Sequence, residues 1–451
     1  MPATLTRDVV ILGGGLAGLT VANVLGDRAV VVEREARPGG LVRSQRIGDY
    51  WFDDVIHVLY FADSGTEERI RALMGSTLQS VHPLAYVETA RGTTRYPLQL
   101  HLSDLDAVTV RRCVKDIAEI SFAPKGEPPR NFRDVLLRSF GPTLCELFFF
   151  PYNEKMWKRP LDTLAPSGFQ WNIACPDLDE VLEGATSTRF ARAYNAAGWY
   201  PRPASGPRGM ELLSQALAAQ ARDIRLQSRA TSIDPERREV IVESNGAHSR
   251  FAYETLCCST LPLPLTVAAC TNAPDDLRES TATLTRNRVL TVAFAIRGPR
   301  PAHSGWWRYY ADPNVIFTRL VFMHHFDPGS APDDGWVLMA EVTQRAEDAF
   351  DEAAIVAQVR ADVDAVGAIP AGSEIVGERL LLIDPAYVVF SLDNREIVER
   401  AKTFLRANDV EPLGRYGRWE YSSMAQVMRD SYAFAEEAQR RIAARQACSP
   451  R

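Results

Sequence analysis

The segment DVVILGGGLAGLTVANVLGDRAVVVE, residues 8–33, decides the fold class. It opens with an apolar run, residues 8–12, that predicts a short buried strand. A glycine-rich turn follows, and residues 16–25 predict a helix. Residues 29–32 then predict a second buried strand. Strand, tight turn, helix and strand in this order predict a Rossmann-like α/β unit.

The turn carries the GxGxxG pattern of a dinucleotide-binding loop. Gly13 permits the sharp turn, Gly15 lets the backbone approach a pyrophosphate, and Gly18 lets helix and strand pack closely. Glu33 ends the second strand, where a carboxylate can accept hydrogen bonds from a ribose diol. The helix N-terminus offers free N–H groups to phosphates. The alternative is a glycine-rich turn in a Rossmann domain that binds nothing.

Composition agrees with a globular protein of 451 residues, of which 46% are hydrophobic and 24% are charged. The formal net charge of -6 argues against a dedicated nucleic-acid-binding protein, which would show a basic excess. Seven cysteines occur without a CxxC spacing, so we expect reduced thiols and neither a disulfide framework nor a metal site.

Residues 9–26 lack charge and are the one candidate for a membrane span. The glycines at their centre, and a length at the short limit for a span, favour the strand–turn–helix reading. No basic segment followed by an apolar run and a cleavage site opens the chain. We therefore expect a cytoplasmic protein without a membrane partner.

The residues after Glu33 distinguish flavin from nicotinamide proteins. Residues 37–44, RPGGLVRS, resemble the glycine-pair motif of glutathione-reductase-type flavoproteins, whose second loop wraps the FAD diphosphate. Residues 51–57, WFDDVIH, resemble the FDxGGH segment of the branch that contains the amine oxidases and UDP-galactopyranose mutases. The chain is similar to FAD proteins of that branch.

Further segments, spread over nearly the whole chain, are similar to those of eukaryotic-type sugar mutases. The closest is GRYGRWEY, residues 414–421, which matches GRxGxWxY. The others are YPLQ at 96–99, FFPYNEKMW at 149–157, NAAGWYP at 195–201, Tyr309 with FTR at 317–319, and AYV at 386–388.

The resemblance implies an α/β fold with three parts. A Rossmann-like FAD domain of the glutathione-reductase type would assemble from residues 1–90, 203–262 and 370–451. Residues 91–202 would form a helical domain, with helices over 131–140 and 142–150. Residues 263–369 would form an antiparallel sheet under the substrate, with strands at 289–296, 315–322 and 336–342 and a helix over 351–366.

The resemblance also assigns residues to the cofactor, the reaction and the substrate. The FAD contacts would be Gly13, Gly15, Gly18, Glu33, Arg34, Gly40, Leu41, Arg43, His57, Gly414, Tyr421 and Met424. The catalytic residues would be Arg319, His57, Tyr421, Tyr387 and Tyr309, of which Arg319 and the three tyrosines would hold a diphosphate. The substrate contacts would be Tyr96, Gln99, Tyr152, Asn153, Trp157, Asn195, Arg319, Tyr309 and Tyr387.

The implied reaction interconverts the pyranose and furanose forms of a nucleotide-linked hexose without net redox change. Reduced FAD would attack the anomeric carbon through N5 and expel the nucleoside diphosphate, which returns after the sugar ring has opened and reclosed. An external donor such as NADPH or NADH would reduce the flavin. A homodimer is one assembly that the sequence allows.

For three of these residues the sequence allows two interpretations. Arg319 lies in an apolar segment and needs an anionic partner, which could be a ligand or a structural salt bridge. Trp157 could stack on a nucleobase or pack in a helix core. His57 could lie beside the isoalloxazine or be a core histidine.

Three departures from the mutase pattern point away from UDP-galactose, toward another UDP-, GDP- or dTDP-linked hexose. Val55 and Ile56 replace the two glycines before the histidine. Residues 170–175 contain no arginine to clamp phosphates, and Trp199 replaces the arginine of the third motif. The rival hypotheses are an FAD-dependent oxidase or dehydrogenase, like amine oxidases or protoporphyrinogen oxidases, and a flavin-binding scaffold without catalysis.

Overall fold

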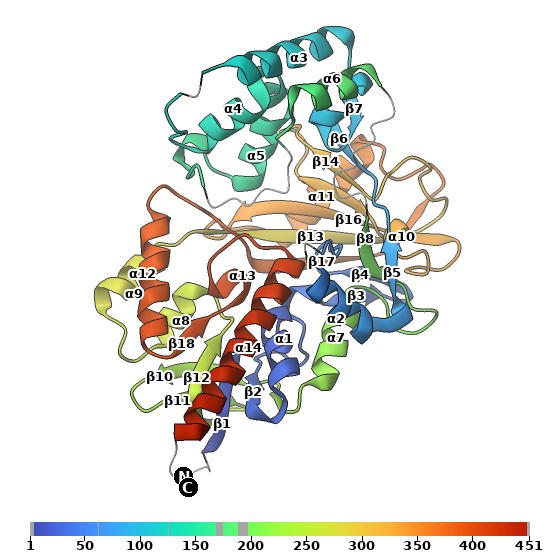
Figure 1. The fold of residues 1–451 in the computed structure, drawn as a ribbon. Helices are drawn as coiled ribbons and strands as arrows, with labels where there is room; N and C mark the ends of the chain where they lie inside the picture. Colours follow the sequence, from blue (N-terminus) through green and yellow to red (C-terminus); the bar gives the residue numbers. More distant parts are fainter. Residues whose placement is uncertain (1–3, 62, 125, 168–174, 188–196, 449–451) are drawn as a thin grey trace.

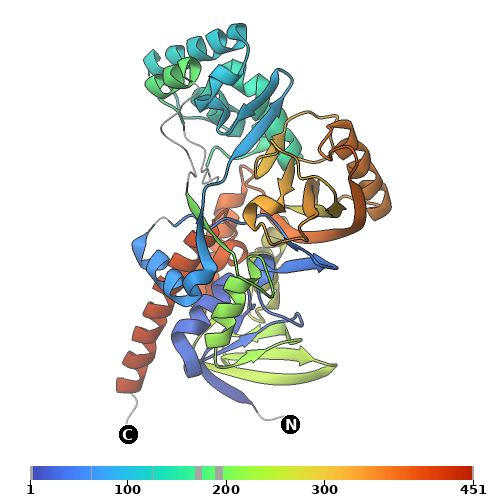
Figure 2. The same cartoon turned by 90° about the vertical axis from the view of Figure 1, so that its right-hand side faces the viewer.

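The computed structural model describes residues 4–61, 63–124, 126–167, 175–187 and 197–448. Three layers are visible (Figure 1): a sheet flanked by helices at the bottom, a second sheet across the middle and a group of helices at the top. After the molecule is turned by 90°, the second sheet lies to the right of the other two layers, which are stacked one above the other (Figure 2). Asn195 and residues 170–174 of the segment expected to clamp phosphates lie outside the described residues.

The first sheet is assembled from segments far apart in the chain. Its strands run in the order β10 (Arg229–Asp234), β11 (Glu239–Ser244), β12 (Ala247–Ser259), β1 (Leu5–Leu12), β2 (Ala29–Val32) and β9 (Ile224–Arg225), with β18 (Val410–Pro412) also paired to β12. Helix α1 (Leu16–Leu25) connects β1 to its parallel neighbour β2. The predicted strand–turn–helix–strand unit is therefore confirmed.

The second sheet is mostly antiparallel. Its strands run in the order β17 (Glu374–Val388), β13 (Arg286–Arg297), β16 (Gly335–Arg345), β15 (Arg319–Phe322), β14 (Trp307–Tyr310), β6 (Ala85–Thr89) and β7 (Gly92–Arg95). Leu290, Val292 and Phe294 on β13 point to one face and pack with Ile355 and Val359 of α11 (Glu352–Ala365). The opposite face is turned toward the first sheet.

Two segments lie in a different sheet from the one expected. Strand β6 falls within residues 1–90 and β17 within residues 370–451, yet both belong to the second sheet. Main-chain pairing with β14 and β13 holds them there. The division of the chain into three domains stays a prediction.

Strand β15 is shorter than the expected strand 315–322. Its predicted first half is withdrawn from the sheet because the Ile316 N–H donates to the Asp362 carboxylate of α11 at 2.6 Å. The strand begins at Arg319.

The helical layer contains α3 (Ala107–Phe122), α4 (Phe132–Leu144), a π-helical segment Cys145–Phe149, α5 (Phe150–Trp157) and α6 (Leu178–Thr186). The break expected before Pro142 is present, because Gly141 adopts a φ of 75°. The expected helix 142–150, however, runs on to Trp157 through the π-helical segment. The i→i+5 hydrogen bonds of the π-helical segment rotate the turns that follow, and this changes which side chains of α5 face the second sheet.

The remaining elements connect these layers. They are β3 (Ser44–Ile47), β4 (Tyr50–Asp53), α2 (Ser64–Met74), β5 (Leu78–Val81), β8 (Gly198–Pro201), α7 (Glu211–Gln220), α8 (Leu263–Ala269), α9 (Asp275–Ala282), α10 (Met323–Phe326), α12 (Asn394–Ala407), α13 (Gly414–Gly417) and α14 (Met424–Cys448). Among the described residues, every helix is too short or too polar to cross a bilayer.

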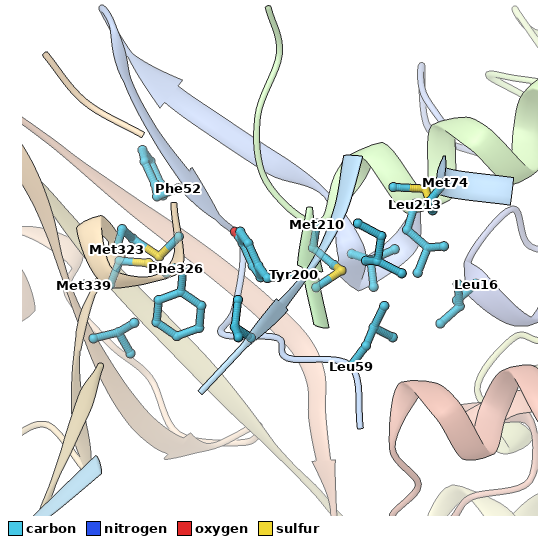
Figure 3. Packing of buried hydrophobic residues seen from close by; sticks show 14 of the residues in the cluster. Leu16, Phe52, Leu59, Met74, Tyr200, Met210, Leu213, Met323, Phe326 and Met339 are labelled. Atoms are coloured by element: carbon cyan, nitrogen blue, oxygen red, sulfur yellow. The ribbon is translucent and has the colours of Figure 1, made fainter. Parts of the chain in front are cut away.

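A buried carboxylate ties these connecting elements together. Asp53 Oδ1 accepts the Ser44 hydroxyl at 2.6 Å and the Met210 N–H at 2.8 Å, and Oδ2 accepts the Tyr200 hydroxyl at 2.7 Å. Tyr200 lies between Met210 on one side and Phe326 on the other, inside the core shared by the two sheets (Figure 3). Burial raises the pKa of Asp53 to about 6 despite its three donors.

This raised pKa links folding to pH. Asp53 binds its proton more tightly in the folded protein than in the unfolded chain, where its pKa is about 3.8. Its contribution therefore favours folding at low pH and is lost as the pH rises from about 4 to about 6. Above that range the Tyr200 hydroxyl must stabilise a buried negative charge.

We expect Tyr200→Phe to destabilise the protein by about 1–3 kcal/mol at pH 8 and by less at pH 5, where Asp53 is protonated. Urea unfolding midpoints at the two pH values measure the difference. Tyr253→Phe is the matched control, because among the described residues the buried Tyr253 hydroxyl has no hydrogen-bond partner. Equal losses for the two variants, or no dependence on pH, would contradict the assignment.

Candidate functional site

Two glycine loops meet at the N-terminus of α1. The Gly39 N–H donates to the Gly14 carbonyl at 2.8 Å, and Gly15 and Gly39 form an isolated bridge. A Cβ atom on Gly40 would lie 3.0 Å from the Gly15 Cα, so two backbones pass with no side chain between them. Gly13 and Gly40 have φ values of 101° and 58°, which favour glycine.

The sequence-predicted cofactor residues around these loops are placed together. No side chain of the described residues caps α1 at Gly15, which leaves its first N–H groups to a ligand. Glu33 follows β2, and its two oxygens accept the Gly14 and Glu35 N–H groups at 2.6 and 2.8 Å. Each oxygen keeps a free lone pair for a ribose hydroxyl.

Arg43 lies beside the second loop and donates from Nε to the Gly40 carbonyl at 2.9 Å. Leu41 packs with Val55 against Val289 and Ile383 of the second sheet. Arg34 points outward instead: its side chain is 69% exposed and pairs with Glu35. A cofactor contact of Arg34 stays a prediction.

A third segment, from the C-terminal part of the chain, contacts the first turn of α1 beside these two loops. The Leu413 N–H donates to the Ser259 carbonyl at 2.8 Å, and a Cβ atom on Gly414 would lie 2.9 Å from the Ala17 Cβ in the first turn of α1. Met424 begins α14 and packs on the core shared by the two sheets. Three loops thus form a glycine-lined cradle that fits a dinucleotide diphosphate.

On the second sheet, an ion pair faces the space between the layers. Arg319 and Glu341 are partners across β15 and β16, and Tyr309 on β14 is the next partner of Arg319. The Arg319 Nε and Nη2 both donate to Glu341 Oε2, at 2.9 and 2.5 Å. Burial alone would lower the pKa of Arg319, but the Glu341 carboxylate raises it above its usual value. Arg319 is a permanent cation whose charge is balanced within the protein.

Tyrosines surround this ion pair. The Tyr309 ring is 5.3 Å from Tyr96 and 5.5 Å from Tyr152, and Tyr387 stacks on Tyr421 at 6.1 Å. Burial raises the pKa of Tyr152 and of Tyr387, and the Glu341 charge adds to both shifts. These hydroxyls stay protonated and can donate hydrogen bonds at neutral pH.

Arg415 is a functional candidate that the sequence prediction omitted. Its guanidinium carbon lies 4.4 Å from the ring centre of Tyr421 and 5.6 Å from that of Tyr387. It donates only to carbonyls, of Ser422 and Ala386, both at 3.2 Å, and no carboxylate of the described residues pairs with it. Its place in the GRxGxWxY-like motif could have drawn attention to it.

His57 lies near both arginines. Burial, followed by the charges of Arg415 and Arg319, lowers the pKa of His57 to about 3. Its Nδ1 is buried and, among the described residues, has no hydrogen-bond partner. The imidazole is therefore neutral at neutral pH. It is hydrogen-bonded to the backbone of Val55, so Nδ1 is the ring nitrogen left for a ligand. We call the set of Tyr152, Tyr309, Arg319, Glu341, Tyr387, Arg415, Tyr421 and His57 the tyrosine–arginine cluster.

Three predicted substrate residues lie inside the protein instead. Gln99, Asn153 and Trp157 are at most 2% exposed. Asn153 donates to the Phe149 carbonyl of its own helical segment at 2.6 Å. Trp157 meets the Tyr387 ring edge-on at 6.1 Å, so it supports a member of the cluster. A direct substrate contact of these three residues stays a prediction.

Trp199 also lies apart from the cluster. The Arg71 guanidinium stacks over its ring at 4.7 Å. It lines one of two open hollows of about 510 Å³, which adjoin each other at Ser76 and share no lining residue with the cluster. Among the described residues, no group of histidine, cysteine and acidic side chains could hold a metal ion.

The position of Arg415 generates a prediction about His57. We expect Arg415→Met to raise the pKa of His57 from about 3 toward 6.5, because a nearby cation disfavours the imidazolium. NMR titration of the seven histidines, labelled with ¹⁵N, measures the shift. Arg418→Met is the control in the same segment, since Arg418 pairs with Asp430 at 2.7 Å. An unchanged His57 titration in Arg415→Met would contradict the placement.

Solved structures of flavin proteins share this fold. Reduced UDP-galactopyranose mutase is 20% identical with a TM-score of 0.87, and the alignment covers 96% of this chain and 94% of that one. A putative protoporphyrinogen oxidase from Exiguobacterium sp. 255-15 is 16% identical with a TM-score of 0.69, covering 96% and 99%. Putrescine oxidase bound to putrescine is 16% identical with a TM-score of 0.62, covering 96% and 99%.

At these identities the likeness concerns the fold. The family assignment rests on sequence: the family model described as flavin containing amine oxidoreductase matches residues 16–378, well over half of the chain. The glycine-lined cradle and the acidic end of β2 are what an FAD-binding member needs. The chain belongs to the flavin-containing amine oxidoreductase family.

Proposed function

We propose that this protein is a flavin-dependent mutase that interconverts the pyranose and furanose forms of a nucleotide-linked hexose. The observation that carries the proposal is the charge of the tyrosine–arginine cluster. Glu341 balances Arg319, His57 is neutral, and Arg415 remains as an uncompensated cation. The cluster therefore carries one net positive charge and favours an anionic ligand over a cationic amine.

The surrounding groups suit a diphosphate in particular. The protonated hydroxyls of Tyr152, Tyr309 and Tyr387 can donate to phosphate oxygens, and a guanidinium can bind two oxygens at once. Arg415 would take the role that the resemblance gave to Arg319, because the guanidinium of Arg319 is already engaged by Glu341.

The glycine-lined cradle, Glu33 and Arg43 would hold the FAD diphosphate and ribose. Reduced FAD would supply a nucleophilic flavin nitrogen for the anomeric carbon, and NADPH or NADH would supply the electrons. This chain's residues then bind the diphosphate after it leaves the sugar, keep it close and exclude water from the site. His57, which is neutral at neutral pH, adds no charge of its own to that binding.

A second candidate is an FAD-dependent oxidase, favoured by one observation. Val55 and Leu41 pack with the buried Val289, Ile383 and Ala386 in an apolar cluster beside the second glycine loop. An uncharged substrate that donates a hydride would fit this side of the site better than a nucleotide sugar. The structural likeness to oxidases is weaker than the likeness to the mutase.

The test uses the purified, FAD-loaded full chain under anaerobic conditions. After reduction with dithionite or NADPH, we expect it to exchange pyranose and furanose isomers of one UDP-, GDP- or dTDP-hexose, detected by chromatography and NMR. The oxidised protein is the control and should not turn over. No isomer from any donor, together with reduction of the flavin by an uncharged substrate, would establish the oxidase instead.

Substitution of Arg415 tests the charge argument directly. We expect Arg415→Met to weaken binding of the nucleoside diphosphate about 10- to 100-fold, which is the loss of one or two charge-assisted hydrogen bonds. Arg415→Lys keeps the charge and should lose less. Arg418→Met should bind as the wild type does. Calorimetric titration measures the affinity of the wild type and of the three variants. An unchanged affinity in Arg415→Met would remove the main support for an anionic substrate.

A further inference from the structure

Two directly paired residues of the second sheet, Thr291 and Glu341, each have a buried polar atom without a hydrogen-bond partner among the described residues. Glu341 Oε2 accepts both N–H groups of Arg319, whereas Glu341 Oε1 accepts none among the described residues. Thr291 is the partner of Glu341 across β13 and β16, and its buried hydroxyl is also unsatisfied. Leaving such groups unpaired in the protein interior is costly.

Both atoms lie on the face of the sheet that is turned toward the cofactor loops. Leu290 and Val292 point to the other face and pack under α11. Strand alternation therefore puts Thr291 on the same face as Val289, which packs with Leu41 and Val55 of the loops around the cradle. Glu341 in turn lies beside Tyr152 and Tyr387.

The chemistry of the two atoms selects one kind of ligand group. A carboxylate oxygen only accepts, and a threonine hydroxyl can donate. Side chains directly opposite each other on antiparallel strands have Cβ atoms about 5 Å apart, so a single small group can bridge them. A hydroxyl satisfies both atoms at once, because it can donate to Glu341 and accept from Thr291.

An ammonium group fits less well, because it would place a further cation beside Arg319 and Arg415. A flavin ring carries an N–H next to a carbonyl and could satisfy both atoms, so the experiment below separates the cofactor from the sugar. We propose that Thr291 and Glu341 Oε1 form a subsite that binds one hydroxyl of the hexose ring and thereby selects the sugar. This inference rests on the proposed mutase function.

Thr291→Val tests the subsite, because it removes the hydroxyl, keeps the β-branched shape and leaves the Arg319–Glu341 pair untouched. Two variants serve as controls. Thr291→Ser retains the hydroxyl, and Thr255→Val removes a buried, unsatisfied hydroxyl from β12 in the first sheet. All are prepared as FAD-loaded full chains. Calorimetry measures their affinity for the nucleotide sugar that the wild type binds and for the bare nucleoside diphosphate.

We expect Thr291→Val to weaken binding of the nucleotide sugar about three- to tenfold, the worth of one neutral hydrogen bond, and to leave the affinity for the diphosphate unchanged. Thr291→Ser and Thr255→Val should match the wild type for both ligands. An unchanged affinity of Thr291→Val for the sugar would overturn the proposal.

Two other outcomes would have different meanings. A shifted flavin spectrum or weaker FAD binding in Thr291→Val, with the sugar affinity unchanged, would assign the two atoms to the cofactor and overturn the proposal. Failure of the wild type to bind any nucleotide sugar or diphosphate would overturn the proposed function itself. That result is seen before any variant is made.

Discussion

The close approach of Gly15 to Gly40 is the constraint on which the site depends. Two backbones that touch without side chains fix the second loop on the first turn of α1, and Gly414 fixes a third loop on the same turn. A side chain at Gly40 would separate the loops and displace Leu41 and Arg43 with them. The sheet below supplies rigidity, since β1 is paired on both sides.

The second sheet supplies the chemistry, and its register decides how charge is distributed. Arg319 and Glu341 neutralise each other because they are direct neighbours on adjacent strands. Arg415, which has no carboxylate partner among the described residues, comes from a different layer, on the short helix α13 that also carries Gly414. The site is thus a contact between layers. The second sheet contributes the balanced ion pair, Tyr309 and Tyr387, helix α5 contributes Tyr152, and the first layer contributes Arg415, Tyr421, His57 and the cofactor loops.

The sequence was sufficient to predict those elements that are determined by residues close together in the chain. The glycine pattern, the apolar runs around it and the acidic strand end predicted β1, α1, β2 and the position of Glu33 correctly. It was insufficient where the outcome depends on partners far along the chain. Nothing in the spacing of Arg319 and Glu341 reveals their register, and nothing near Arg415 reveals that no carboxylate of the described residues pairs with it. The sequence left open whether Trp157 stacks on a ligand or packs in the core, and tertiary packing places it in the core.

The discontinuous first sheet has a consequence for how the protein is made. Strand β1 is synthesised long before two other strands of its sheet: its partner β12 spans residues 247–259, and β18, which pairs with β12, spans residues 410–412. At about 10 residues per second, the valine-rich strands β1 and β2 wait for tens of seconds before their sheet can close. During that interval their backbone edges are open to pairing with other nascent chains.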